Sequence, residues 1–148
     1  MKSVLILALA TALELVVMLA YGATSDRIGL IKTMAGEVTI TRSSQTIKAA
    51  PNMKLMEADI VQTGPDGKAG LILDDDTIIS MGLNSRIAIK SFMFHPNDKK
   101  LSLIARIFHG TVSFLSGQIT KLAPEQAHIE TPYATIGLRG THVLIQID

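Results

Sequence analysis

The sequence has no cysteine and no tryptophan, and its only aromatic residues are four phenylalanines and two tyrosines. Without cysteine there are no disulfides, no thiol nucleophiles and no thiolate metal ligands. So few aromatic side chains argue against a sugar cleft and against base stacking. The 14 Lys and Arg residues nearly balance the 13 Asp and Glu residues. Because the net charge is close to zero, we expect no nucleic-acid partner.

The first 23 residues differ in composition from the rest. Lys2 precedes a long apolar stretch, and small residues close it at Ala20 and Gly22. This order is typical of a secretory signal peptide and predicts a periplasmic or extracellular protein. Glu14 interrupts the apolar stretch, which would be costly in a permanent membrane helix. Two alternatives for residues 1–23 remain: an uncleaved anchor and a buried helix. The anchor would be the chain's one link to the membrane. The domain then spans residues 24–148.

Alternation of apolar and polar residues dominates the rest of the chain, and no helical period is sustained after residue 30. The pattern predicts an all-β fold of short twisted strands, a β-roll or solenoid-like sandwich that follows the N-terminal signal helix. Strands are expected within residues 37–42, 69–73, 77–81, 86–90, 101–103, 112–114 and 143–147. The expected core residues are Leu103, Val112, Phe114, Ile136, Val143 and Ile145.

Turn residues separate these segments about every ten positions. Residues 63–67, Thr-Gly-Pro-Asp-Gly, predict a tight turn, since proline presets φ and glycine accepts positive φ. Residues 95–100 and 122–126 predict polar connections. Residues 74–76 are three aspartates, which favour a solvated hairpin turn because the ligand spacing and glycine of a calcium loop are missing.

No catalytic or metal-binding pattern emerges. The four histidines are too far apart in sequence for a zinc motif, and they are His95, His109, His128 and His142. A G-x-S-x-G elbow is missing. Residues 64–69 resemble a phosphate loop, but the spacing is two residues short and no hydroxyl follows the lysine. We therefore expect no metal, no cofactor and no enzymatic activity.

The most distinctive stretch is residues 129–142, where a Thr-Pro break, a short strand, a Gly-Leu-Arg-Gly-Thr corner and a further strand follow each other. The structural corner motif comprises Thr131, Pro132, Gly137, Arg139, Gly140 and Thr141. The flanking glycines predict a tight bend around Arg139. Its guanidinium is expected to clamp the corner, for example onto Glu130 or Asp59, and a ligand anchor is the alternative. A clamp predicts that Arg139→Ala destabilises more than Lys68→Ala.

This corner resembles the signature of the FecR domain, and the resemblance runs from about Gly36 to the end of the chain. Further matching segments are residues 36–38, 58–64, 75–77, 84–87, 110–112 and 116–117. Ala58 and Asp76 stand where the family usually has glycine. The resemblance implies an envelope signalling domain, which in regulators follows a sigma-factor-binding segment and one membrane helix. Since only three residues precede the apolar stretch here, it implies a free-standing exported FecR domain.

The leading functional hypothesis is a protein-interaction module of the cell envelope that binds a partner in signalling or assembly. A mechanism is strand addition, because the apolar run from Thr141 to Ile147 ends in a single charge at Asp148 and predicts an open sheet edge. Self-association through that edge, giving a structural envelope protein, is the second hypothesis. A small envelope hydrolase or carbohydrate-binding protein is the third.

Overall fold

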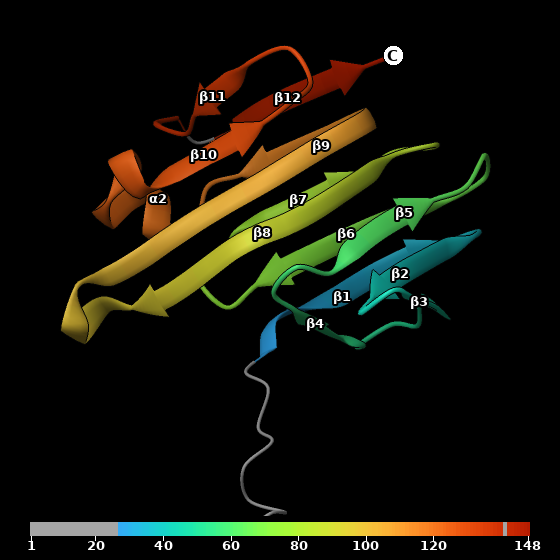
Figure 1. Ribbon diagram of the computed structural model, residues 1–148, viewed down its shortest axis with the longest axis horizontal. Helices are drawn as coiled ribbons and strands as arrows, with labels where there is room; N and C mark the ends of the chain where they lie inside the picture. Colours follow the sequence, from blue (N-terminus) through green and yellow to red (C-terminus); the bar gives the residue numbers. More distant parts are fainter. Residues whose placement is uncertain (1–26, 141) are drawn as a thin grey trace, which may run out of the picture.

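The computed structural model describes residues 27–140 and 142–148, which consist mainly of β-strands (Figure 1). The strands are β1 (Arg27–Ala35), β2 (Val38–Arg42), β3 (Gln45–Lys48), β4 (Lys54–Met56), β5 (Ile60–Thr63), β6 (Lys68–Leu73), β7 (Ile78–Met81), β8 (Arg86–His95), β9 (Lys100–Leu115), β10 (Ala127–Glu130), β11 (Thr135–Gly137) and β12 (His142–Ile147). The helical turns are η1 (Pro96–Asp98), α2 (Gln118–Leu122) and η2 (Pro124–Gln126). The all-β prediction is confirmed. The predicted signal peptide, residues 1–23, lies outside the described residues.

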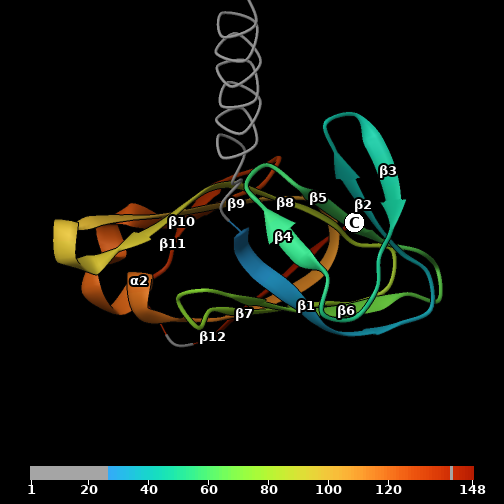
Figure 2. The same cartoon turned by 90° about the horizontal axis from the view of Figure 1, so that it is seen from below.

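The strands form one sheet that curls into two facing layers (Figure 2). Layer A consists of β12, the second half of β9, β7, β6, β1 and β4, in that order. Layer B consists of β3, β2, β5, β8, the first half of β9, β10 and β11. Neighbouring strands are antiparallel except β9 and β10. The arrangement is a curled antiparallel sheet and not the stack of parallel rungs that a solenoid would require.

The long strand β9 joins the two layers, and it changes partners at Gly110. Residues before Gly110 pair with β8, and residues from Gly110 onward pair with β12. Gly110 has a φ of 102°, and a Cβ there would lie 2.2 Å from Ser85 Oγ. Only glycine fits such a position without displacing the neighbour. Ser85 Oγ accepts a 3.0 Å hydrogen bond from Thr111 N, and Thr63 Oγ1 accepts one of 2.9 Å from Ser85 N. This buried network holds the bend in place.

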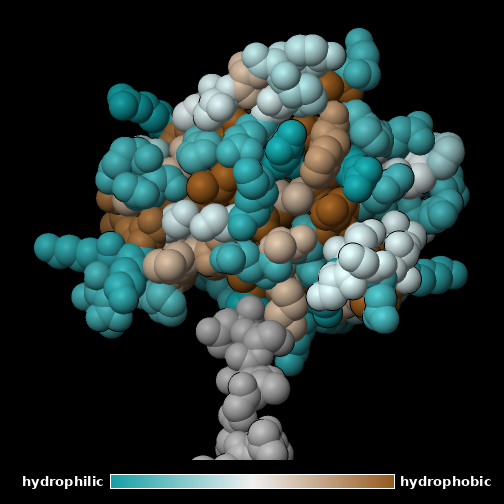
Figure 3. All heavy atoms as spheres, in the orientation of Figure 1, coloured by the Kyte–Doolittle hydropathy of each residue, from teal (hydrophilic) through white to brown (hydrophobic). Residues whose placement is uncertain are grey.

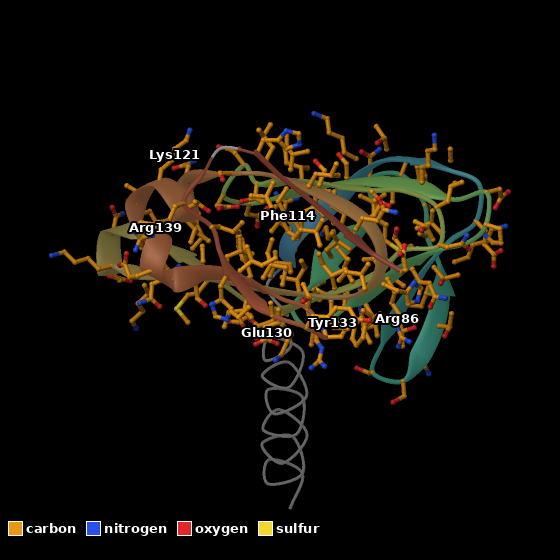
Figure 4. All side chains as sticks on the ribbon, turned by 90° about the horizontal axis from the view of Figure 1, so that it is seen from above. Arg86, Phe114, Lys121, Glu130, Tyr133 and Arg139 are labelled. Atoms are coloured by element: carbon orange, nitrogen blue, oxygen red, sulfur yellow. The ribbon has the colours of Figure 1, made fainter. Side chains whose placement is uncertain are left out.

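The core lies between the layers, where alternate residues of each strand point inward. Figure 4 shows Phe114 between the two layers. Four of the six predicted core residues are buried, namely Leu103, Val112, Phe114 and Ile145. Ile136 and Val143 are partly buried and pack against the core from β11 and β12. Period-two alternation therefore identified the inward face correctly.

The turn predicted at residues 63–67 is confirmed. Gly67 N donates a 3.0 Å hydrogen bond to Gly64 O, which closes a β-turn with Pro65 at its second position. The loop predicted at residues 95–100 contains η1 and ends at Lys99, whose φ is 54°. The connection predicted at residues 122–126 falls on the end of α2 and on η2.

The sequence predicted a solvated hairpin turn at the three aspartates between β6 and β7. This prediction is wrong for the middle one. Asp75 is fully buried, and its carboxylate accepts hydrogen bonds from Thr77 N (3.1 Å), Thr77 Oγ1 (2.9 Å) and Ile119 N (3.1 Å). The carboxylate thus ties the hairpin to the first turn of α2. Asp74 is exposed and lies 3.4 Å from Arg27.

Two residues that replace the glycines of the FecR pattern keep a glycine-like backbone. Ala58 has a φ of 69° and Asp76 a φ of 70°. Both values lie in the left-handed region, which costs a residue with a Cβ about 1 kcal/mol or more. The chain therefore retains the turn geometry at both positions although it lacks the residue that adopts it most easily.

A second buried carboxylate, Asp59, fixes the end of β2. Arg42 donates hydrogen bonds of 2.9 Å from Nε and 2.7 Å from Nη2 to the two oxygens of Asp59. Met56 N donates to the same carboxylate at 2.9 Å. The hydrogen bond with Asp59 raises the pKa of Arg42, although partial burial opposes this effect. Asp59 is thus saturated with structural bonds.

Candidate interaction surface

The Thr-Pro break of the predicted corner forms the loop of the β10–β11 hairpin. Thr131 N donates to Ala134 O at 2.9 Å, and Thr131 Oγ1 accepts from Tyr133 N (3.2 Å) and Ala134 N (3.0 Å). Pro132 occupies the second position of this turn, for which its fixed φ is suited. Tyr133 stands at the tip with 82% of its surface exposed.

Residues 138–140 connect β11 to β12. Leu138 is buried, and its N donates a 3.0 Å hydrogen bond to Ala127 O. Ser116 Oγ donates to Gly140 O. Arg139 is exposed at the end of the molecule that carries α2 (Figure 4). Thr141 lies outside the described residues.

The clamp predicted between Arg139 and Glu130 or Asp59 is not formed. Asp59 is bound by Arg42, and Glu130 Oε2 accepts a 2.8 Å hydrogen bond from Lys90 Nζ. Arg139 makes no hydrogen bond or ion pair with any residue in the described ranges. Arg42 and Lys90 already bind these two carboxylates, and the sequence did not reveal these pairings because they are long-range.

The glycines beside Arg139 do not enforce the tight bend that the sequence suggested. A Cβ added at Gly137 or at Gly140 would meet no other atom within 4 Å, and neither residue has a positive φ. The space around both positions is open. The corner is therefore shaped by Thr131 and Leu138 and not by these two glycines.

The hydrogen bond from Lys90 lowers the pKa of Glu130. The positive charges of Lys90, His128 and Arg106 act in the same direction, while burial opposes them. His128 Nε2 lies 3.8 Å from Glu130 Oε1. These groups form a charged row on the outer face of layer B, and Figure 3 shows that face as hydrophilic with scattered apolar side chains.

The histidines are dispersed, and two of them contact oxygen atoms of neighbouring residues. His109 Nδ1 lies 2.8 Å from Asn84 O, and His142 Nε2 lies 2.8 Å from Ser113 Oγ. Within residues 27–140 and 142–148, no three His, Asp or Glu side chains gather into a metal site. The buried carboxylates Asp59 and Asp75 serve separate turns. The described part of the chain thus offers no converging acid–base constellation of the kind a hydrolase requires.

A groove lies between the tip of the β8–β9 hairpin and the α2–η2 segment. Met93, Leu101 and Leu122 supply its apolar lining. Lys99 and Glu125 lie at the same groove and carry opposite charges. No histidine or carboxylate pair converges there.

A sheet edge runs along β12, the segment for which the sequence predicted an open edge. Within the described residues, β12 pairs with β9 alone, over the register from His142 opposite Leu115 to Ile147 opposite Gly110. Ile145 and Ile147 point inward and are each only 8% exposed. β12 therefore presents one edge to the surroundings while its inward face is part of the core.

A row of four apolar residues crosses the outer face of layer A and ends at His142 of β12. Consecutive residues of the row are partners across neighbouring strands: Leu30, Ile72, Ile78, Leu115 and His142. Leu115 is 44% exposed, and Leu144, the next outward residue of β12, is 67% exposed. Sequence alternation could have identified Leu144, because it is the one apolar residue on the polar face of β12.

We call β12 together with Leu115 and Ile78 the edge surface. Within residues 27–140 and 142–148, the outer edge of β12 pairs with no other strand, and exposed aliphatic side chains lie beside it. Such an edge can accept a protein segment as an added strand. Among the described residues, no helix is both long enough and apolar enough to cross a lipid bilayer.

The fold and this surface define a class: small all-β domains whose buried polar groups are structural and whose surface offers a strand edge. The FecR protein family model matches residues 59–148, so the chain belongs to the FecR family. This family is associated with the cell envelope and its signalling, and it is not a family of enzymes. No curated protein and no solved structure matches the chain significantly.

Proposed function

We propose that this chain is an exported protein-interaction module of the cell envelope, and that it binds a protein partner by strand addition at the edge surface. The observation that carries the proposal is the contrast between β12 and the other edges. Within the described residues four strands have a single partner each: β3, β4, β11 and β12.

Three of these edges are short, and two of the three carry lysine. β4 and β11 have three residues each, and β3 has four, including Lys48. Short length and lysine are two of the ways in which proteins prevent edge-to-edge pairing. β12 has six residues and no charged side chain. It is therefore the edge best suited to accept another strand.

Membership of the FecR family supports an envelope role, since its members are associated with envelope signalling. A periplasmic or extracellular location follows in this proposal from the N-terminal signal. The partner then meets the edge surface outside the cytoplasm.

The test is site-specific photo-crosslinking in intact cells. A photoreactive residue replaces Gln146, which is exposed on β12, and a matched control replaces Thr46, which is exposed on the polar edge strand β3. We expect defined adducts from position 146 and none from position 46. Adducts of the same mass from both positions, or no adduct from position 146, would contradict binding at this edge.

Truncation after Gly140 is not a suitable test. It would remove Ile145 and Ile147 from the core, and each large-to-small loss of this kind costs about 2–5 kcal/mol. Leu144→Lys is preferable, because the side chain points outward and is 67% exposed. This variant should keep the melting temperature and lose the adduct at position 146.

A further inference from the structure

We propose that the strand added to β12 is β12 of a second copy of this chain, paired antiparallel about a two-fold axis at Leu144. This inference rests on the proposed function, because it identifies the partner of the same edge. Several independent features of the described residues support it, and they concern strand register, charge and exposed apolar surface.

The first feature is the register that two copies of β12 allow. His142, Leu144 and Gln146 point outward, whereas Val143, Ile145 and Ile147 point inward. Residues opposite each other in a sheet share a face, so outward residues must oppose outward residues. With Leu144 opposite its own copy, His142 opposes Gln146 and Val143 opposes Ile145. Outward side chains of one copy then oppose outward side chains of the other, and inward side chains oppose inward ones.

The second feature is that self-pairing meets no electrostatic obstacle. No residue from His142 to Ile147 carries a formal charge when the histidine is neutral. A two-fold axis brings each residue near its own copy, so a charged edge would place like charges together. β3, which contains Lys48, would have this disadvantage.

The third feature explains the exposed position of Arg139. In the proposed register Asp148, the residue after β12, lies beyond His142 of the second copy, at the end where residues 139–140 precede that strand. The side chains of Arg139 and Asp148 are exposed, and neither has an ion-pair partner among the described residues. The two-fold axis creates this contact twice. Opposite charges that flank β12 on its two sides favour an antiparallel pair over a parallel one.

The fourth feature is the exposed apolar surface at and near β12 on the outer face of layer A. Leu144, Leu115 and Ile78 are 67%, 44% and 37% exposed. Pairing two copies at Leu144 places the two Leu144 side chains directly opposite each other on the outer face. Burial of exposed apolar side chains at a contact is typical of an association surface.

The test uses cysteine crosslinking of the purified full chain, whose sequence contains no cysteine. Opposed residues of an antiparallel pair have Cα atoms about 4.5–5.5 Å apart, within the span of a disulfide. We expect Leu144→Cys to form a disulfide-linked dimer on mild oxidation. The matched control Thr46→Cys, on the edge of β3, should stay monomeric.

The same method checks the register. Equimolar His142→Cys and Gln146→Cys should form a mixed dimer. Neither should dimerise alone, because like positions would be about 14 Å apart along the strand. A dimer of Gln146→Cys alone, or crosslinking of Leu144→Cys to Gln146→Cys in preference to itself, would overturn the proposed register.

Charge reversal tests the contact between Arg139 and Asp148. Arg139→Glu and Asp148→Lys should each weaken dimerisation about tenfold at low salt, since each alters two symmetric exposed pairs. The double variant should restore the dissociation constant to within about threefold of the original. Sedimentation equilibrium measures these constants, and a double variant weaker than both single variants would refute the pairing.

The outcomes separate this inference from the proposed function. If the purified chain stays monomeric and Leu144→Cys does not crosslink, but position 146 gives an adduct with another protein in cells, the second copy is wrong and strand addition stands. If position 146 gives an adduct of twice the chain's mass, both stand. If position 146 gives no adduct and no disulfide forms, both are wrong.

Discussion

The buried carboxylate of Asp75 gives the most stringent test of how this fold is held together. Asp75→Ala removes the acceptor for Thr77 N, Thr77 Oγ1 and Ile119 N. Thr77 is itself buried, as is Ile119. A buried donor that loses its partner costs about 1–3 kcal/mol, and two backbone N–H groups are affected. The variant also avoids burying a charge, which offsets part of the loss.

We expect a net destabilisation of about 3 kcal/mol, which corresponds to a fall in melting temperature of roughly 12 °C for a domain of this size. The neighbouring variant Asp74→Ala is the matched control. Asp74 forms an exposed ion pair with Arg27 at 3.4 Å, and such a pair contributes less than about 1 kcal/mol.

Urea unfolding followed by far-ultraviolet circular dichroism measures both variants, since the chain has no tryptophan to report by fluorescence. The denaturant slope should be unchanged, because the surface exposed on unfolding is nearly the same. If Asp75→Ala and Asp74→Ala unfold within about 0.5 kcal/mol of each other, Asp75 does not tie the hairpin to α2.

Three further outcomes follow from the structure. Ala58→Gly should raise the unfolding free energy by about 1 kcal/mol because φ is positive there, and a lower melting temperature would contradict this. Arg139→Ala should match Lys68→Ala to within about 0.5 kcal/mol in the monomer, since both side chains are exposed; a larger loss for Arg139→Ala in dilute thermal melts would revive the clamp. Because the pKa of Glu130 is lowered in the folded state, the Lys90–Glu130 pair stabilises the fold at pH values above 4.5, the ordinary pKa of the carboxyl group, and this stability is lost as the pH falls through the lower folded pKa. Lys90→Ala should therefore reduce the loss of melting temperature on acidification. A melting temperature that depends on pH as in the original protein would contradict this.

Local patterns predicted most of the strands but not their connections. Alternation located β2, β6, β7 and β12 to within about a residue or two at each end. It did not predict that β9 runs continuously through Gly110, because the partners change there from β8 to β12 and the bend depends on Ser85. A change of partners is decided by packing of distant segments, and a local pattern carries no information about it.

Side-chain roles were predictable only where the partner is local. The turn at residues 63–67 follows from its own four or five residues and is confirmed. Asp75 binds Ile119, 44 residues away, so its burial could not be read from an aspartate run. The prediction that Arg139 binds Glu130 or Asp59 was wrong, because Arg42 and Lys90, which are distant in sequence, bind these carboxylates instead.

β12 belongs to the core and also carries the edge at which we propose that a partner binds. Its inward residues Ile145 and Ile147 belong to the core, so the strand does not detach easily to expose or hide its edge. A rigidly held edge loses little conformational entropy when another strand is added, which favours affinity. The same rigidity makes an uncovered edge a constant aggregation hazard. The three other edges are short, with lysine on two of them, whereas β12 is long and uncharged, which is the arrangement that the proposed strand addition requires.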